Sequence, residues 1–225
     1  MTTVLGLDGG DGFSWCGVLL ELDGSGDIRS WSIDRTWHRL EYDQLPGHWR
    51  AAEVMCIDAP MYGRLPDQRR QRGCDRHAKQ VVSRELRSSF FAVPSSADVD
   101  EYLESGKVGQ GQIRCLVPYI VAAEGIADRH GRVIEGHPEL TFSRLSSGAS
   151  LEKKKTPSGI QARNELLPIS NHSFPAGDHL DAFAMALTAR AYHLGRAVAF
   201  TNDGGPFNQQ QARGATPAIW SVWLP

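Results

Sequence analysis

Three carboxylates in this sequence stand where short apolar segments end. Asp8 follows Val-Leu-Gly-Leu, Asp58 follows Val-Met-Cys-Ile, and Glu135 follows Arg-Val-Ile. Such segments are typical of β-strands, and the carboxyl ends of parallel strands lie on one side of a sheet, where sites are commonly built. We therefore expect Asp8, Asp58 and Glu135 to lie on the same side of one sheet.

A second acidic pair is expected to join them. Asp178 and Asp181 begin an alanine-rich helix, and their spacing places both on one helix face. Together with the strand-end carboxylates they form a group that does not ionise fully without a cation. Oxygen ligands select Mg²⁺ or Mn²⁺. Two such ions about 4 Å apart activate water and stabilise the leaving oxygen of a phosphodiester.

These residues also have structural interpretations. Asp8 precedes Gly9 and Gly10 in a glycine-rich turn between two strands, where it could form an Asx-turn. The same glycines could let a phosphate approach the backbone closely. Asp178 could be an N-cap with Asp181 as its N3 partner. The sequence leaves both interpretations open.

Positive charge gathers in two segments. Between residues 64 and 87, eight arginines and lysines accompany three acidic residues. This fits either a solvated helix face or a phosphate-contacting surface beside Asp58. Lys154 and Lys155 belong to a second basic segment, which fits a solvated loop or a phosphate-binding loop.

The elements that must position these residues form an alternating α/β pattern. A hairpin at 4–7 and 18–22 and a third strand at 28–33 predict an antiparallel meander, followed by strands at 53–58 and 132–135. Helices are expected at 97–105, 112–128 with a kink at Pro118, from Pro138, at 158–168, and from 178 to about 194, with an interrupted helix in 35–52. Two strands near 197–201 and 218–223 are expected to flank a loop at 203–215.

Length and composition exclude few classes of function. The 225 residues are expected to form a single domain, 1–225, and the net charge of −2 argues against a protein that is basic as a whole. The four cysteines have no close pairing that would indicate a metal site or disulfides, and Cys56 is expected to be a buried thiol. No targeting segment or membrane-length apolar run is evident, so we expect a cytoplasmic protein without membrane contact.

The sequence resembles the predicted RNase H-like nuclease family known as domain of unknown function 429. The matching motifs span nearly the whole chain, and the Glu-x-His-Pro-Glu after a strand is the most specific. They are Gly6-Leu7-Asp8, Ile57-Asp58-Ala59-Pro60, Arg72-Gly73-Cys74-Asp75, Ser88-Ser89-Phe90-Phe91, Glu135-Gly136-His137-Pro138-Glu139, Lys154-Lys155-Thr156 with Gly159 and Arg163, and Asp178-His179-Leu180-Asp181-Ala182. The resemblance implies an RNase H-like fold, with a mixed central sheet that combines the meander with parallel strands and is flanked by helices.

The leading hypothesis is a metal-dependent nuclease that cleaves phosphodiester bonds of DNA, RNA or a small phosphodiester. Asp8, Glu135, Asp178 and Asp181 would ligate Mg²⁺ or Mn²⁺, with Asp58 as a further catalytic carboxylate. The expected substrate-binding residues are Arg72, Asp75, His137, Lys154, Lys155 and Arg163. Two alternatives stay open: a nucleotide-binding phosphotransferase of the sugar-kinase, actin and Hsp70 group, and a non-catalytic nucleic-acid-binding or regulatory protein. The sequence is also compatible with a homodimer.

Overall fold

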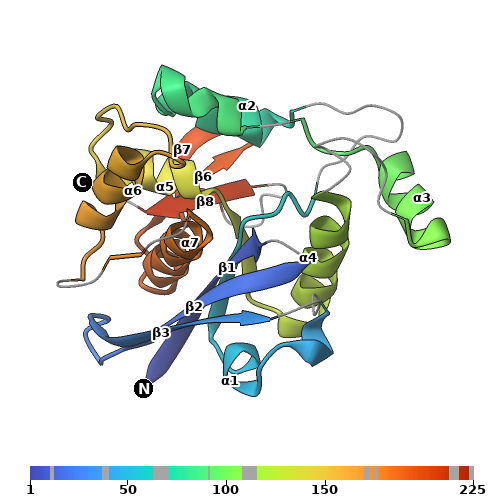
Figure 1. Ribbon diagram of the computed structural model, residues 1–225, viewed down its shortest axis with the longest axis horizontal. Coiled ribbons are helices and arrows are strands. Elements are labelled where there is room, and N and C mark those ends of the chain that lie inside the picture. The colour runs from blue at the N-terminus through green and yellow to red at the C-terminus, as the bar shows by residue number, and fades with distance from the viewer. Residues whose placement is uncertain are drawn as a thin grey trace.

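The computed structural model describes residues 1–10, 13–36, 41–62, 71–90, 92–107, 116–169, 173–174, 177–212 and 218–222. Within these residues the strands form one eight-stranded sheet in the order β3-β2-β1-β4-β5-β8-β6-β7 (Figure 1). The strands are β1 (Thr2–Gly10), β2 (Ser14–Leu22), β3 (Ile28–Thr36), β4 (Val54–Ile57), β5 (Val133–Gly136), β6 (Ala197–Thr201), β7 (Gly204–Asn208) and β8 (Ala218–Val222). The helices are α1 (Gly47–Arg50), α2 (Gly73–Val81), α3 (Ser96–Ser105), α4 (Val117–His130), α5 (Pro138–Leu145), α6 (Pro157–Glu165) and α7 (Gly177–His193), with 3₁₀ turns η1 (Tyr42–Gln44) and η2 (Arg84–Ser89).

The direction of the strands confirms the predicted fold class. Strands β1, β2 and β3 form an antiparallel meander. Strands β4, β5 and β8 then run parallel to β1, and β6 and β7 complete the sheet in antiparallel fashion. An antiparallel meander continued by parallel strands in the order 3-2-1-4-5, with helices on both faces, is the RNase H-like arrangement.

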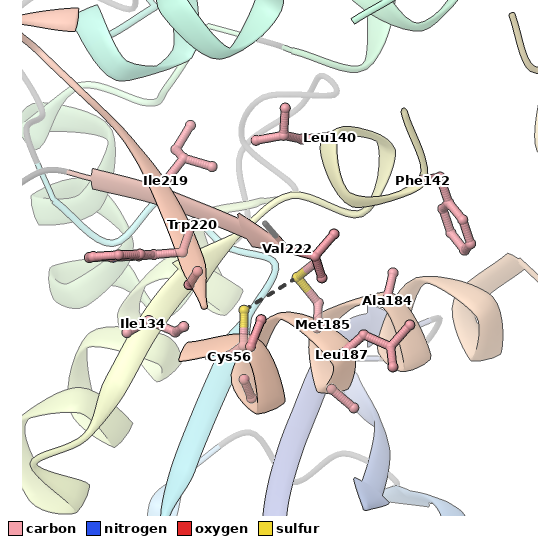
Figure 2. Close-up of a cluster of buried hydrophobic side chains, with 14 of the residues drawn as sticks. Cys56, Ile134, Leu140, Phe142, Ala184, Met185, Leu187, Ile219, Trp220 and Val222 are labelled. Carbon is pink, nitrogen blue, oxygen red and sulfur yellow. Dashed lines mark hydrogen bonds between the residues drawn. The ribbon is translucent and has the colours of Figure 1, made fainter. Parts of the chain in front are cut away.

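Alternation along the strands creates two separate cores. Val4 and Cys56 face α7, whereas Leu5 and Met55 belong to the second core, which includes α4. Figure 2 shows Met185 of α7 reaching Cys56 of β4, where the Sγ and Sδ atoms are 3.7 Å apart. The expected buried thiol is therefore part of the contact between the sheet and α7.

A glycine allows α7 to lie directly on the sheet. A Cβ atom at Gly6 of β1 would come within 2.1 Å of the backbone nitrogen of Ala186 and 2.2 Å of the carbonyl oxygen of Ala182. The alanine-rich sequence of α7 serves the same close approach, because small side chains let backbones come together. Asp8 lies two residues beyond Gly6, and Asp181 directly precedes Ala182, so this contact brings their two elements together.

Three local predictions need correction. The hairpin turn is tighter than expected, because β1 continues through Gly9 and Gly10, which pair with Trp15 and Ser14. The predicted loop at 203–215 contains β7, whose backbone pairs with β6 even though the sequence is poor in apolar residues. Pro118 does not kink α4 but lies in its first turn. A backbone N–H in the first turn has no partner within the helix, so its absence in proline removes no helical hydrogen bond.

The predictions for residues 35–52 and for the cysteines can be compared with the structure only in part, because some of these residues lie outside the described ranges. The interrupted helix expected in 35–52 is reduced to η1 and the short α1, while residues 37–40 lie outside the described part. Cys16, Cys56 and Cys74 are free and buried, and Cys115 lies outside the described part. Among the described helices, none is long and apolar enough to cross a membrane.

Candidate functional site

Asp8 and Asp58 lie side by side, Asp8 two residues before the end of β1 and Asp58 directly after β4. The parallel register pairs Leu7 with Ile57, so the two aspartates that follow are neighbours on the face covered by α7. The Asp58 amide donates a hydrogen bond to the Leu7 carbonyl at 3.0 Å, which continues the ladder by one step. The pairing predicted from the strand ends is thus present.

Asp181 reaches the same place from α7. Its side chain is almost fully buried, with 1% of the residue exposed, and Oδ2 accepts a hydrogen bond from the Lys154 ammonium. The other carboxylate oxygen, Oδ1, is buried without a hydrogen-bond partner. Buried oxygens of this kind are rare and call for an explanation, such as an ion that is part of the working site.

The electrostatics of this group reflect crowding of negative charge. Burial raises the pKa of Asp8 well above its usual range, and the charges of Asp181 and Asp58 raise it further. Burial and the charge of Asp181 raise the pKa of Asp58 to about 7, although Lys154 opposes the shift. Neighbouring negative charge therefore disfavours ionisation of Asp8 and Asp58 without a cation.

Lys154 is the cation of this cluster. Burial disfavours its charge, but Asp181 and Asp8 outweigh that effect and raise its pKa above the ordinary value. The lysine predicted to contact phosphate therefore contacts a carboxylate in this structure. Its neighbour Lys155 is exposed to solvent.

Asp178 lies at the rim of the same cluster. Its carboxylate forms an ion pair with Arg35 at 3.0 Å, and its charge contributes to the raised pKa of Asp8. Arg35 was missed in the sequence because β3 was expected to end at Ile33. The register of the meander aligns Asp8 with Cys16 and Cys16 with Arg35, so a longer third strand would have identified it.

Glu135 belongs to a second cluster. The register aligns Glu135 with Ile57, the residue before Asp58. Because side chains alternate along a strand, Glu135 and Asp58 project from opposite faces of the sheet. Two guanidinium nitrogens of Arg72 bind its carboxylate, one at 2.8 Å, and the Met61 amide donates at 3.1 Å. Its charge still contributes to the raised pKa of Asp58. The expectation that Glu135 shares one group with Asp8 and Asp181 overlooked this alternation.

Arg72 holds the second cluster together. Its Nε and Nη2 atoms each lie 2.9 Å from a carboxylate oxygen of Asp75, which also accepts a hydrogen bond from the Arg72 amide. Arg72 and Asp75 thus close the first turn of α2, and both are buried. Further along the helix, Arg76 is exposed and donates to the Gln71 carbonyl. Arg64, Arg69 and Arg70 lie outside the described residues.

Two other predicted substrate-binding residues are engaged inside the protein. Arg163 of α6 is fully buried and pairs with Glu139 at 2.7 Å, a partner that the sequence analysis did not assign. His137 stacks on Phe90 with ring centroids 3.9 Å apart. Burial lowers the pKa of His137 to about 4, so the imidazole is neutral at pH 7.

The space beside Gly9 is occupied by an aromatic ring. An added Cβ at Gly9 would come within 2.9 Å of Tyr119, and the Tyr119 hydroxyl donates to the Gly10 carbonyl. The close approach that the glycines permit is therefore used by Tyr119 of α4. A phosphate was expected there, both in the metal-site interpretation and in the phosphotransferase alternative.

The structure thus separates the predicted residues into groups. We define the acidic cluster as Asp8, Asp58, Asp181 and Lys154, and the arginine cluster as Arg72, Asp75 and Glu135. Within the described residues, no three His, Cys, Asp or Glu side chains are arranged as a ready metal centre. In the acidic cluster, the ammonium group of Lys154 is the cation bound to Asp181.

The fold and the acidic cluster together define an RNase H-like protein with neighbouring aspartates toward the carboxyl ends of two parallel strands. Residues 6–204 match the model of the family described as Protein of unknown function (DUF429), and the chain belongs to this family. No curated protein matches the chain.

Two solved structures from Thermus thermophilus resemble it at low identity. A RuvC in complex with a Holliday junction substrate aligns over 86% of this chain and 97% of that chain, with 13% identity and a TM-score of 0.38. A second RuvC structure aligns over the same shares, with 11% identity and a TM-score of 0.35. We assign the fold from the strand order.

Proposed function

We propose that this protein is a metal-dependent phosphodiesterase that acts on nucleic acid. The observation that carries the proposal is the meeting of the buried Asp8 and Asp181 with the partly buried Asp58, with Asp181 Oδ1 lacking a partner. Glu135, by contrast, has an Arg72 nitrogen on each carboxylate oxygen and the Met61 amide on Oε2. The acidic cluster lacks this balance, and perturbed groups of this kind gather at functional sites.

The donor set fits a hard divalent cation. Three carboxylates offer oxygen ligands of the type that Mg²⁺ and Mn²⁺ prefer, and a cation would relieve the repulsion that helps to raise the pKa values of Asp8 and Asp58. Lys154 occupies part of this position through its contact with Asp181. Ligation would require the ammonium group to withdraw from Asp181, which would leave it available to a phosphate.

The proposed reaction is hydrolysis. The oxygen of water forms a bond to phosphorus, the bond from phosphorus to one sugar oxygen breaks, and that oxygen leaves with a proton. When bound, Mg²⁺ or Mn²⁺ supplies activation of the water and stabilisation of charge on the phosphoryl group. Asp8, Asp58 and Asp181 would hold the cation, and Asp178 at the rim is a further ligand candidate.

The test uses the full chain with Mn²⁺. We expect Mn²⁺ to raise the melting temperature, since a ligand that binds only the folded state stabilises it, and to support cleavage of labelled DNA or RNA strands. Asp8→Asn should lose most of the Mn²⁺ stabilisation and the cleavage. Asp100→Asn, which changes an exposed carboxylate on α3, is the matched control and should behave like the parent. Equal Mn²⁺ stabilisation of parent and Asp8→Asn would place the metal elsewhere and contradict the proposal.

A further inference from the structure

A cavity of about 200 Å³ opens beside the acidic cluster. Asp58 and Lys154 line it, and so do Glu135 and His137, so the cavity touches both clusters. Pockets for drug-sized ligands usually measure about 300–1,000 Å³. This one therefore has room for a single small planar group but not for a nucleic-acid duplex.

The charged side chains of the cavity wall are paired with one another. Each cation among the described residues of the wall is bound to at least one carboxylate, and the wall offers no unpaired cation to an anion. The pairs are Arg72 with Glu135 and Asp75, Lys154 with Asp181, and Glu139 with Arg163. If metal binding releases Lys154 to the phosphate at the acidic cluster, the other charged pairs of the wall stay intact, so the rest of the wall offers no cation to a second phosphate and does not repel a neutral ring.

The rest of the wall suits a flat, largely apolar ligand. Phe90 and His137 are stacked with an angle of 3° between their planes, and both line the cavity together with Pro60 and Val93. Aromatic and aliphatic side chains of this kind favour a flat, uncharged ligand over an ionised one.

We infer that this cavity receives one unpaired nucleobase, while the adjoining phosphate lies at the acidic cluster. The inference rests on the proposed function and specifies its substrate: a nucleotide that is single-stranded, terminal or extruded from a duplex. A paired base inside a duplex would first have to leave the stack, which requires a few kcal/mol. Unpaired nucleotides should therefore react in preference to paired ones.

The first experiment compares substrates with the Mn²⁺-loaded full chain. A labelled single strand, the same strand in a perfect duplex, and a duplex with one bulged nucleotide are incubated in parallel. We expect the perfect duplex to be cleaved at least about tenfold more slowly than the single strand, and cleavage of the bulged duplex to map to the bulge. Equal rates on all three substrates would overturn the inference but leave the proposed function intact.

The second experiment tests the base directly. Deoxyadenosine monophosphate should inhibit cleavage, and 2-deoxyribose 5-phosphate, which lacks the base, should inhibit at least about tenfold less. Equal inhibition by both would overturn the inference. If deoxyadenosine monophosphate binds but no oligonucleotide is cleaved, the proposed action on nucleic acid fails and the cavity assignment stands.

A substitution that fills the cavity separates the two proposals further. Ala92 lines the cavity and is only half-buried, so Ala92→Trp should occupy it and weaken binding of deoxyadenosine monophosphate at least about tenfold in a calorimetric titration. Its gain in melting temperature with Mn²⁺ should persist, which also verifies folding. Ala51→Trp, at an exposed position before β4, is the matched control and should resemble the parent. Undiminished mononucleotide binding to a folded Ala92→Trp would overturn the inference.

Discussion

The acidic cluster and the arginine cluster lie beside each other at the same strand ends, yet their charges are arranged in opposite ways. In the arginine cluster, one guanidinium group binds both Asp75 and Glu135, and its nitrogens contact oxygens of each carboxylate. In the acidic cluster, three aspartates face one ammonium group, and Asp181 Oδ1 has no partner.

This difference suggests that the charges of the arginine cluster stabilise the fold, whereas those of the acidic cluster serve the proposed metal site. A buried ion pair with complete hydrogen bonding is self-sufficient, and removal of one partner leaves an uncompensated charge. In the acidic cluster, the charges of neighbouring aspartates add to burial in raising the pKa values of Asp8 and Asp58, so the cluster gains when a cation enters or a charge is removed. Three substitutions test this comparison through the free energy of unfolding without metal.

Arg72→Met should have the largest effect. It leaves Glu135 and Asp75 buried without their cation, so we expect a loss of about 3–5 kcal/mol in the free energy of unfolding, measured by urea denaturation. Arg76→Met, on an exposed position of the same helix, should change it by no more than about 0.5 kcal/mol. A similar small effect for Arg72→Met would mean that the arginine cluster does not stabilise the fold.

Lys154→Met should have an intermediate effect with a second consequence. The ammonium side chain is 36% exposed and partly screened, so we expect a loss of about 1–2 kcal/mol without metal. Because the competing cation is gone, Mn²⁺ should bind at least about tenfold more tightly in a calorimetric titration. Lys155→Met, which alters the exposed neighbour, should change neither quantity. Weaker Mn²⁺ binding to Lys154→Met would show that the lysine does not compete with the metal.

Asp8→Asn should have the smallest effect on metal-free stability. Burial and neighbouring carboxylates disfavour the charged form of Asp8, and the amide removes that charge at nearly constant size. We expect the free energy of unfolding to stay within about 0.5 kcal/mol of the parent or to increase. A marked loss of stability would identify Asp8 as a structural turn residue and remove the contrast between the two clusters.

The sequence predicted the positions of individual strands and helices, because the pattern that specifies each one lies within its own segment. Apolar runs that end at Asp8 and Asp58 correctly located two neighbouring strands, although β1 continues to Gly10, and the alanine-rich segment after Asp178 correctly predicted α7. Such patterns depend on local periodicity, which the chain carries in itself. The same signals predicted the hairpin, the third strand and the parallel strands. The strand directions in the structure confirm the fold class that they implied.

The division of the charged residues into two clusters was decided by the tertiary structure. Glu135 and Asp58 both end strands, but a one-residue difference in register sends their side chains to opposite faces. Arg72 and Lys154 are both basic residues in loops or helix starts, and only long-range packing decides that one binds Glu135 and the other Asp181. The sequence alone therefore determined which residue types stand at the strand ends. Register and the approach of α7 at Gly6 determined which of them meet, because such contacts join segments far apart in the chain.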